Sequence, residues 1–270
     1  MSESLRKRVA TAAVLIALLL GVLFWLPPAA TVALLTLVVL MGAWEWSAFL
    51  KWTDPRPRAA YVALIAVLLP LVWRVTRSPS GLEALLGGAL LWWMAALVWI
   101  MVAPRRVRRW SAGLAGILSL VPAWLALVHL RLGPAHGAQW VLFALVLVWM
   151  ADIGAYFCGR WFGRRRLAPL VSPGKTWEGA LGGLAASGTV AVAGAAWFRL
   201  PLELFLVLCL AAVGFSIVGD LTESLLKRFA GMKDSGTLFP GHGGVMDRID
   251  SVTGAVPVLL LGLTFLGVLP

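Results

Sequence analysis

Residues 82–102 read LEALLGGALLWWMAALVWIMV, an apolar stretch of 21 residues in which Glu83 is the one charged side chain. A membrane-crossing helix needs about 20 predominantly apolar residues, because the hydrocarbon core is about 30 Å thick and a helix rises about 1.5 Å per residue. This stretch therefore predicts a transmembrane helix.

Eight further runs of the same kind surround it, and Pro- and Gly-containing turns separate several of them. The nine runs are 9–26, 29–50, 59–75, 82–102, 111–130, 138–158, 177–198, 201–219 and 251–269. The first could be a cleaved signal peptide, but the many spans that follow favour a retained helix. We expect an all-α integral membrane protein, a polytopic bundle of about nine transmembrane helices, with five spans in residues 1–130 and four in a catalytic region, 131–270.

Composition supports this fold class. Hydrophobic residues make up 61% of the 270-residue chain, charged residues only 13%, and the mean hydropathy is +0.91. An ordinary soluble domain is about 25% charged, so a disordered chain and a soluble enzyme are excluded. The two cysteines are too few for a disulfide framework.

The distribution of the positive charge, which gives a net charge of +11, indicates how the chain is oriented in the membrane. Nine crossings put 19 of the 23 Lys and Arg residues on one side of the membrane, in the segments 1–8, 51–58, 103–110, 159–176 and 220–250. Because cytoplasmic segments carry the excess of Lys and Arg, we expect a cytoplasmic N-terminus and a periplasmic C-terminus. Most of the positive charge is then an orientation signal, and no nucleic-acid partner is expected.

The orientation signal explains the cations but not the positions of the acidic residues. Seven of the 12 fall at the cytoplasmic side of the C-terminal half: Asp152, Glu178, Asp220, Glu223, Asp234, Asp247 and Asp250. A carboxylate at membrane depth is costly and marks a functional site by default, which favours a role for Asp152 over a pairing with the loop residue Arg160. Glu45, between two tryptophans of the second run, could equally be a structural acid or a wall of the site.

Segment 220–250 holds most of these acids together with cations and a glycine-rich turn. Asp220, Ser224 and Lys227 share one helical face, and so do Asp247 and Asp250. Mg²⁺ is typically held by one or two carboxylates plus substrate phosphates, whose charge Lys and Arg neutralise. Residues 240–244 either bring backbone N–H groups close to phosphate or form only a tight turn. The segment predicts Mg²⁺-assisted nucleotidyl or phosphoryl transfer at the cytoplasmic face.

The other polar loop, 159–176, contains Gly174-Lys175-Thr176, which looks like the end of a phosphate-binding P-loop. Pro169 stands where the first glycine of that motif belongs, so the P-loop interpretation is rejected. Lys175 still precedes a helix start on the same side of the membrane as 220–250. We expect an anion site there.

The pattern of residues 224–250, S-x2-K-R-x4-K-D-x-G-x3-P-G-H-G-G-x2-D-R-x-D, resembles the signature of the phosphatidate cytidylyltransferase (CDP-diacylglycerol synthase) family. The resemblance extends to residues 44–46, 151–156, 172–177 and 219–224. It implies a bacterial inner-membrane enzyme that condenses CTP with phosphatidic acid to CDP-diacylglycerol and pyrophosphate. It also implies Mg²⁺, with K⁺ beside it, a homodimer, and a site that faces the cytoplasm.

The resemblance carries roles onto matching positions. It implies metal binding by Asp220, Asp247 and Asp250, and catalytic roles for these three with Ser224 and Lys227. Ser224 would bind metal or phosphate, and His242 would orient pyrophosphate or cap the turn. The substrate-binding positions are Asp152, Lys175, Arg228, Lys233, Asp234, His242 and Arg248.

Two rival functions are less consistent with the sequence. A membrane transporter predicts acids spread over several spans and a repeated half, whereas the acids here gather in one half without an evident repeat. Another Mg²⁺-dependent lipid enzyme, a CDP-alcohol phosphotransferase, needs a D-x2-D-G-x2-A-R segment. Asp250 is followed by Ser251, which breaks that pattern.

Overall fold

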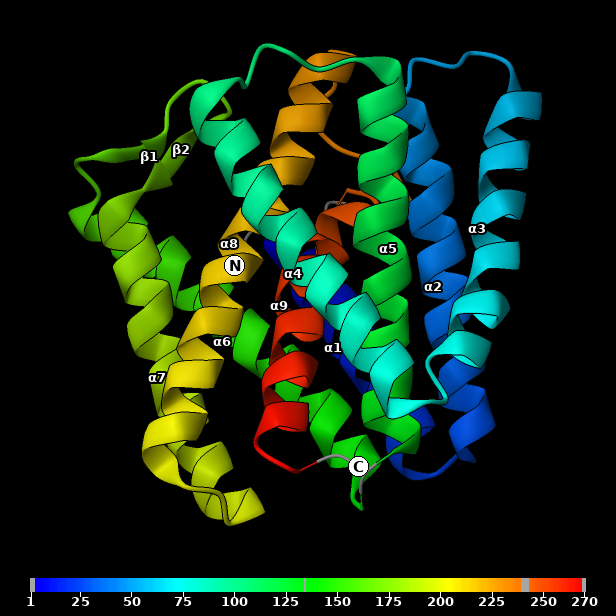
Figure 1. The fold of residues 1–270 in the computed structure, drawn as a ribbon. Helices are drawn as coiled ribbons and strands as arrows, with labels where there is room; N and C mark the ends of the chain where they lie inside the picture. Colours follow the sequence, from blue (N-terminus) through cyan, green and yellow to red (C-terminus); the bar gives the residue numbers. More distant parts are fainter. Residues whose placement is uncertain (1–2, 134, 239–242, 269–270) are drawn as a thin grey trace.

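The computed structural model describes residues 3–133, 135–238 and 243–268, with the side chains of all of these except 3–12 and 15. In this part of the chain, helices form an upright bundle and a small β-hairpin stands at one end of it (Figure 1). The elements are α1 Glu3–Phe24, α2 Pro28–Phe49, α3 Pro55–Val75, α4 Pro79–Val102, α5 Arg109–Leu132, α6 Gly137–Phe162, β1 Arg166–Ala168, β2 Ser172–Thr176, α7 Trp177–Phe198, α8 Leu202–Ala230 and α9 Met246–Phe265.

Proline and small polar residues determine where several helices begin. α2, α3 and α4 each carry proline in the first turn, where the missing N–H costs nothing and the fixed φ suits a helix. Asp54 accepts a hydrogen bond from the backbone N–H of Arg56, and Ser78 accepts one from Gly81. These are the turn segments that separate the apolar runs in the sequence.

The core is formed around α5 and α9. In each, 72% of the most apolar 18-residue stretch is buried inside the protein, against 17–39% for the corresponding stretches of the other six long apolar helices. Figure 1 shows α5 and α9 between α2 and α3 on one side and α6 and α7 on the other. Because lipid tails are as apolar as leucine, the exposed apolar faces of the outer helices are compatible with a bilayer.

The membrane fold class is confirmed, with two differences in detail. Within the described residues, eight helices, α2 to α9, are long and apolar enough to cross a membrane; the crossing of α1 stays a prediction. A two-stranded antiparallel sheet also interrupts the helices, pairing Arg166 with Thr176 and Ala168 with Ser172.

The extent of the loop 220–250 is corrected. α8 continues 11 residues beyond the expected end at 219 and stops at Gly231, whose φ is +75°. Its 29 residues span about 43 Å, which exceeds the hydrocarbon thickness, so the charged last turns can remain helical outside the apolar layer. The connection to α9 is therefore 231–245, and 159–162 likewise belongs to α6.

Helices α6 and α7 pack closely through small residues. A side chain at Gly154 would overlap the carbonyl oxygen of Gly182 and lie 2.6 Å from Cβ of Ala186. Small residues allow this approach of two backbones in a membrane. The pair forms one wall of the site described next.

Candidate active site

A cavity of about 610 Å³ lies between α6, α7, α8, α9 and the β-hairpin. Among the described residues, it brings together most of the predicted site from three separate parts of the sequence. The predicted residues that line it are Asp152, Lys175, Asp220, Lys227, Asp234, Asp247, Arg248 and Asp250.

The remaining predicted residues are placed differently. Ser224 stands one turn from Asp220, with its hydroxyl 3.5 Å from Oδ1 of that carboxylate. Arg228 and Lys233 are exposed and do not appear in the lining within the described part of the chain. His242 falls in 239–242, outside the described residues.

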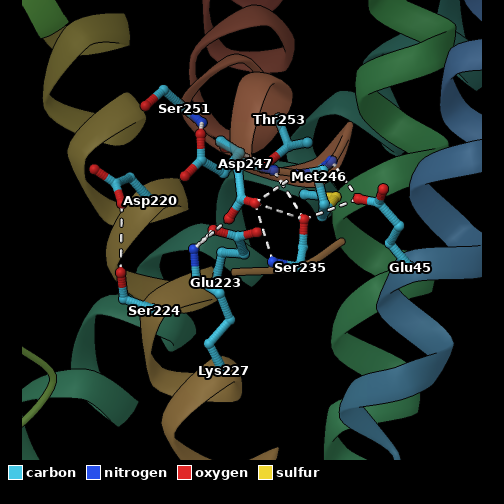
Figure 2. A network of polar contacts seen from close by, with 12 residues as sticks. Glu45, Asp220, Glu223, Ser224, Lys227, Ser235, Met246, Asp247, Ser251 and Thr253 are labelled. Carbon is cyan, nitrogen blue, oxygen red and sulfur yellow. Dashed lines mark hydrogen bonds and ion pairs between the residues drawn. The ribbon is translucent and has the colours of Figure 1, made fainter. Parts of the chain in front are cut away.

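Lys227 joins α8 to α9. Its ammonium lies 2.8 Å from Oδ1 of Asp247 and 2.5 Å from Oε2 of Glu223, one turn earlier on α8 (Figure 2). Glu223 is completely buried. It is one of the seven clustered acids, but no site role is predicted for it from the sequence. Its i, i+4 spacing to Lys227 is the sequence signal that indicates their contact.

Asp247 is held by several donors at once. Oδ1 accepts from Lys227, and Oδ2 accepts from the backbone N–H groups of Ser235 and Gly244 at 3.0 and 2.8 Å. The Ser235 hydroxyl is also 3.0 Å from Oδ2. Asp247 is thus anchored at the start of α9 and directs Lys227 toward the cavity.

Asp152 and Asp250 line the cavity from two different helices, α6 and α9. The Ser251 hydroxyl donates to Oδ1 of Asp152 across 3.4 Å, which links α9 to α6. Asp250 is buried, and its Oδ1 accepts the N–H of Ser251 at 2.7 Å. Arg160, the alternative partner of Asp152, donates to the hydroxyl of Tyr156 at 3.0 Å.

Lys175 reaches the cavity from β2 and pairs with the carboxylate of Asp220. Burial lowers the pKa of Lys175 to about 8, although the nearby Asp250 and Asp152 carboxylates oppose the shift. The next residue, Thr176, caps α7 by accepting the N–H of Gly179 at 3.1 Å. Gly174-Lys175-Thr176 is thus a strand end and a helix cap with one cation in the cavity.

Glu178 holds the hairpin. Its Oε2 accepts the backbone N–H groups of Arg164 and Arg165 at 3.0 and 3.2 Å. It is absent from the cavity lining among the described residues. Of the seven clustered acids, this one therefore has a structural role.

Glu45 also has structural partners. Its carboxylate accepts the Ser235 hydroxyl at 2.8 Å and the N–H groups of Val245 and Met246 at 3.0 and 2.8 Å. These partners lie about 200 positions away in the sequence, so no local pattern indicated them. The backbone N–H of Gly244 is directed at Asp247, which supports the tight-turn interpretation for Gly244; residues 240–242 lie outside the described part of the chain.

The acids fit a metal that is bound together with substrate. In the part of the chain that the structure describes, no group of three or more His, Cys, Asp or Glu side chains forms a complete metal cage. Mg²⁺ needs only one or two protein carboxylates when phosphates supply other ligands. Asp220 and Asp250 line the same cavity as Lys175, Lys227 and Arg248, a donor set suited to a divalent cation with polyphosphate.

Comparison with known proteins identifies the family to which the chain belongs. A model of the cytidylyltransferase family matches residues 6–266. The chain is 45% identical over 263 residues to the phosphatidate cytidylyltransferase of Pseudomonas aeruginosa, which covers 94% of this chain and 95% of that protein. It is 39% identical over 278 residues to the phosphatidate cytidylyltransferase of Haemophilus influenzae, with 94% and 96% covered. The chain therefore belongs to the cytidylyltransferase family.

Proposed function

We propose that this protein condenses CTP with phosphatidic acid to CDP-diacylglycerol and pyrophosphate. The observation that carries the proposal is a cavity in which acids and cations from α6, β2, α8 and α9 meet. The relatives with the same activity in their names cover nearly the whole chain.

The reaction needs little proton transfer. A phosphate oxygen of the lipid attacks the α-phosphorus of CTP, and the bond from that phosphorus to the bridging oxygen breaks, so pyrophosphate leaves with the electron pair. A phosphate monoester has a second pKa of about 6 and is largely ionised at pH 7. No protein base is then required, and positioning and charge stabilisation make the main contribution.

The cavity residues divide these tasks. Lys175, Lys227 and Arg248 bind the phosphates of the two anionic substrates, with Arg228 and Lys233 attracting them from the exposed surface. Asp220, Asp250 and Asp247 are the carboxylates we assign to Mg²⁺, and Asp247 takes part when one of its present donors moves away. When bound, Mg²⁺ would neutralise phosphate charge and orient the leaving group.

The setting of the site is part of the proposal. The bacterial relatives, the one-sided cations and the apolar helices support an inner-membrane enzyme whose cavity faces the cytoplasm. Lipid substrate then arrives from the bilayer and CTP from the water. We also propose a homodimer, which size measurement in detergent or nanodiscs tests directly.

The test is pyrophosphate release by the purified protein in lipid nanodiscs. Release should require CTP, phosphatidic acid and Mg²⁺ together, stop with EDTA and return with excess Mg²⁺. Diacylglycerol in place of phosphatidic acid is the matched control, because it lacks the attacking phosphate. Comparison of KCl with NaCl tests the contribution of K⁺. No release by folded protein with all three components present would refute the proposed function.

A further inference from the structure

We propose that Glu45, on α2 in the N-terminal half, is a positioning residue for the active site. It holds the start of α9 and the connection 231–245, and through them Asp247. The part of this inference that is measured by enzyme activity rests on the proposed function. Its structural part is measured independently below.

Glu45 is buried on a helix that is anchored to the centre of the bundle. Its side chain is 9% exposed, and the neighbouring Trp46 is almost completely buried. The indole of Trp46 donates to the carbonyl of Ala112 at 2.8 Å, which ties α2 to the central helix α5. A buried carboxylate on an anchored helix offers an acceptor whose position hardly varies.

Its first partners are the N–H groups of Val245 and Met246, where α9 begins. Such groups have no acceptor within their own helix, and a negative charge at a helix N-terminus is favourable. Glu45 supplies both the acceptor and the charge from another helix. Since α9 carries Asp247 and Asp250, any displacement of its first turn displaces both cavity carboxylates.

Its third partner is the Ser235 hydroxyl, which stands between two carboxylates (Figure 2). The hydroxyl oxygen is 2.8 Å from Oε2 of Glu45 and 3.0 Å from Oδ2 of Asp247. A hydroxyl has one proton to donate, so it donates to one of the two carboxylates at a time, and its position between them links Glu45 to Asp247. The same oxygen faces the N–H of Asp247 at 3.3 Å, which completes the link.

Two glycines of the connection, Gly236 and Gly244, are explained by the same contact. A Cβ at Gly236 would overlap Oε1 of Glu45, and a Cβ at Gly244 would overlap Oε2. The backbone can approach the carboxylate this closely only without side chains there. Gly236 and Gly244 are thus required by the approach of this connection to a residue of α2.

The first experiment is Glu45→Gln, which keeps the size and removes the charge. The amide nitrogen must face an N–H donor, so one buried hydrogen bond to a charged group is lost, and kcat should fall about tenfold or more. KM for phosphatidic acid should change less than twofold, because Glu45 does not line the cavity among the described residues. Hydrogen exchange should increase in residues 231–246 and stay unchanged in α5 and α7.

The matched control is Glu83→Gln, the same chemical change at an exposed position of α4; it should leave both readouts as in wild type. Ser235→Ala removes the hydroxyl that joins Glu45 to Asp247 and should also raise exchange in 231–246. If Glu45→Gln fails to fold, Ser235→Ala alone decides. A second test uses a compensating pair of substitutions. Gly236→Ala alone should impair turnover, because the new methyl group overlaps the Glu45 carboxylate. Adding Glu45→Asp, which shortens that side chain, should partly restore turnover.

Three results would overturn the positioning role. These are wild-type exchange in 231–246 for the folded Glu45→Gln or Ser235→Ala protein, an equal increase in every helix, or turnover within twofold of wild type. An inactive wild type would instead refute the proposed function, and the exchange comparison would still test the position of the connection.

Discussion

The ammonium of Lys227 lies 2.8 Å from the carboxylate of Asp247 and bridges α8 to α9 at the cavity wall. Each residue also contacts its own helix or loop, Lys227 through Glu223 and Asp247 through the N–H of Gly244. Because both charges are partly removed from water, the pair fixes the distance between the two helices as well as the local charge.

Asp247→Asn should reduce turnover by about a hundredfold, since a misplacement of about 1 Å in a site has that effect. The amide nitrogen would face N–H donors, and we expect the free energy of unfolding to fall by about 1–3 kcal/mol. Pyrophosphate release and thermal unfolding in detergent measure the two effects. Asp54→Asn is the control, because asparagine caps a helix as well as aspartate. Turnover of Asp247→Asn close to wild type would remove Asp247 from the site.

Lys227→Met should destabilise the protein by about 3–5 kcal/mol, because it leaves the buried carboxylate of Glu223 and that of Asp247 without their cation. Adding Glu223→Gln removes one uncompensated charge and should recover part of this loss. Activity should stay low in both variants, since the phosphate-binding ammonium is gone. Thermal unfolding of Lys227→Met, Glu223→Gln and the double variant tests the coupling, and simple addition of the two single effects would show that Glu223 and Lys227 do not interact.

Binding of CTP should weaken as the pH rises through about 8. The pKa of Lys175 is lowered to about 8 by burial, so the charged, anion-binding form is populated below that pH and lost above it. The value of kcat/KM for CTP reports the free enzyme and should fall above pH 8. Lys175→Arg keeps its charge, so the fall should disappear in that variant. The same fall in Lys175→Arg would assign the titration to another group.

The lowered pKa of Lys175 also makes the free energy of unfolding depend on pH. The unfolded chain, with its Lys175 at the ordinary value of 10.5, binds more protons than the folded chain between pH 8 and 10.5. The contribution of Lys175 to the free energy of unfolding therefore increases with pH across that window. Unfolding midpoints of wild type and Lys175→Arg, compared at pH 8 and 10, measure this difference.

Gly154→Ala should force α6 and α7 apart, because the new methyl group overlaps the carbonyl of Gly182. We expect a loss of about 1–3 kcal/mol in the free energy of unfolding and lower turnover, since Asp152 lies on the same helix. Gly188→Ala is the matched control on α7, where a Cβ meets no atom within 4 Å. It should be neutral or stabilising by about 0.5–1 kcal/mol. Similar unfolding curves for the two variants would contradict this packing.

Much of the fold and of the site follows from local sequence. Apolar runs long enough to span a bilayer predict α2 to α9, and proline with small polar residues predicts where several of them begin. The end of α8 was misjudged by 11 residues, because hydropathy marks the edge of the apolar layer and not the end of a helix. The face shared by Asp220, Ser224 and Lys227 was predicted correctly, since a helix has a regular period of 3.6 residues.

Contacts between residues on distant helices could not be predicted from local sequence. The sequence shows an acid at position 45 and a serine at position 235, but not that they lie 2.8 Å apart. Nor does it distinguish Glu178, which holds a hairpin, from Asp250, which lines the cavity. Helix length and cluster composition depend on residues close in the chain. The partner of each buried carboxylate depends on how helices cross and in which direction each side chain points, and only packing decides that.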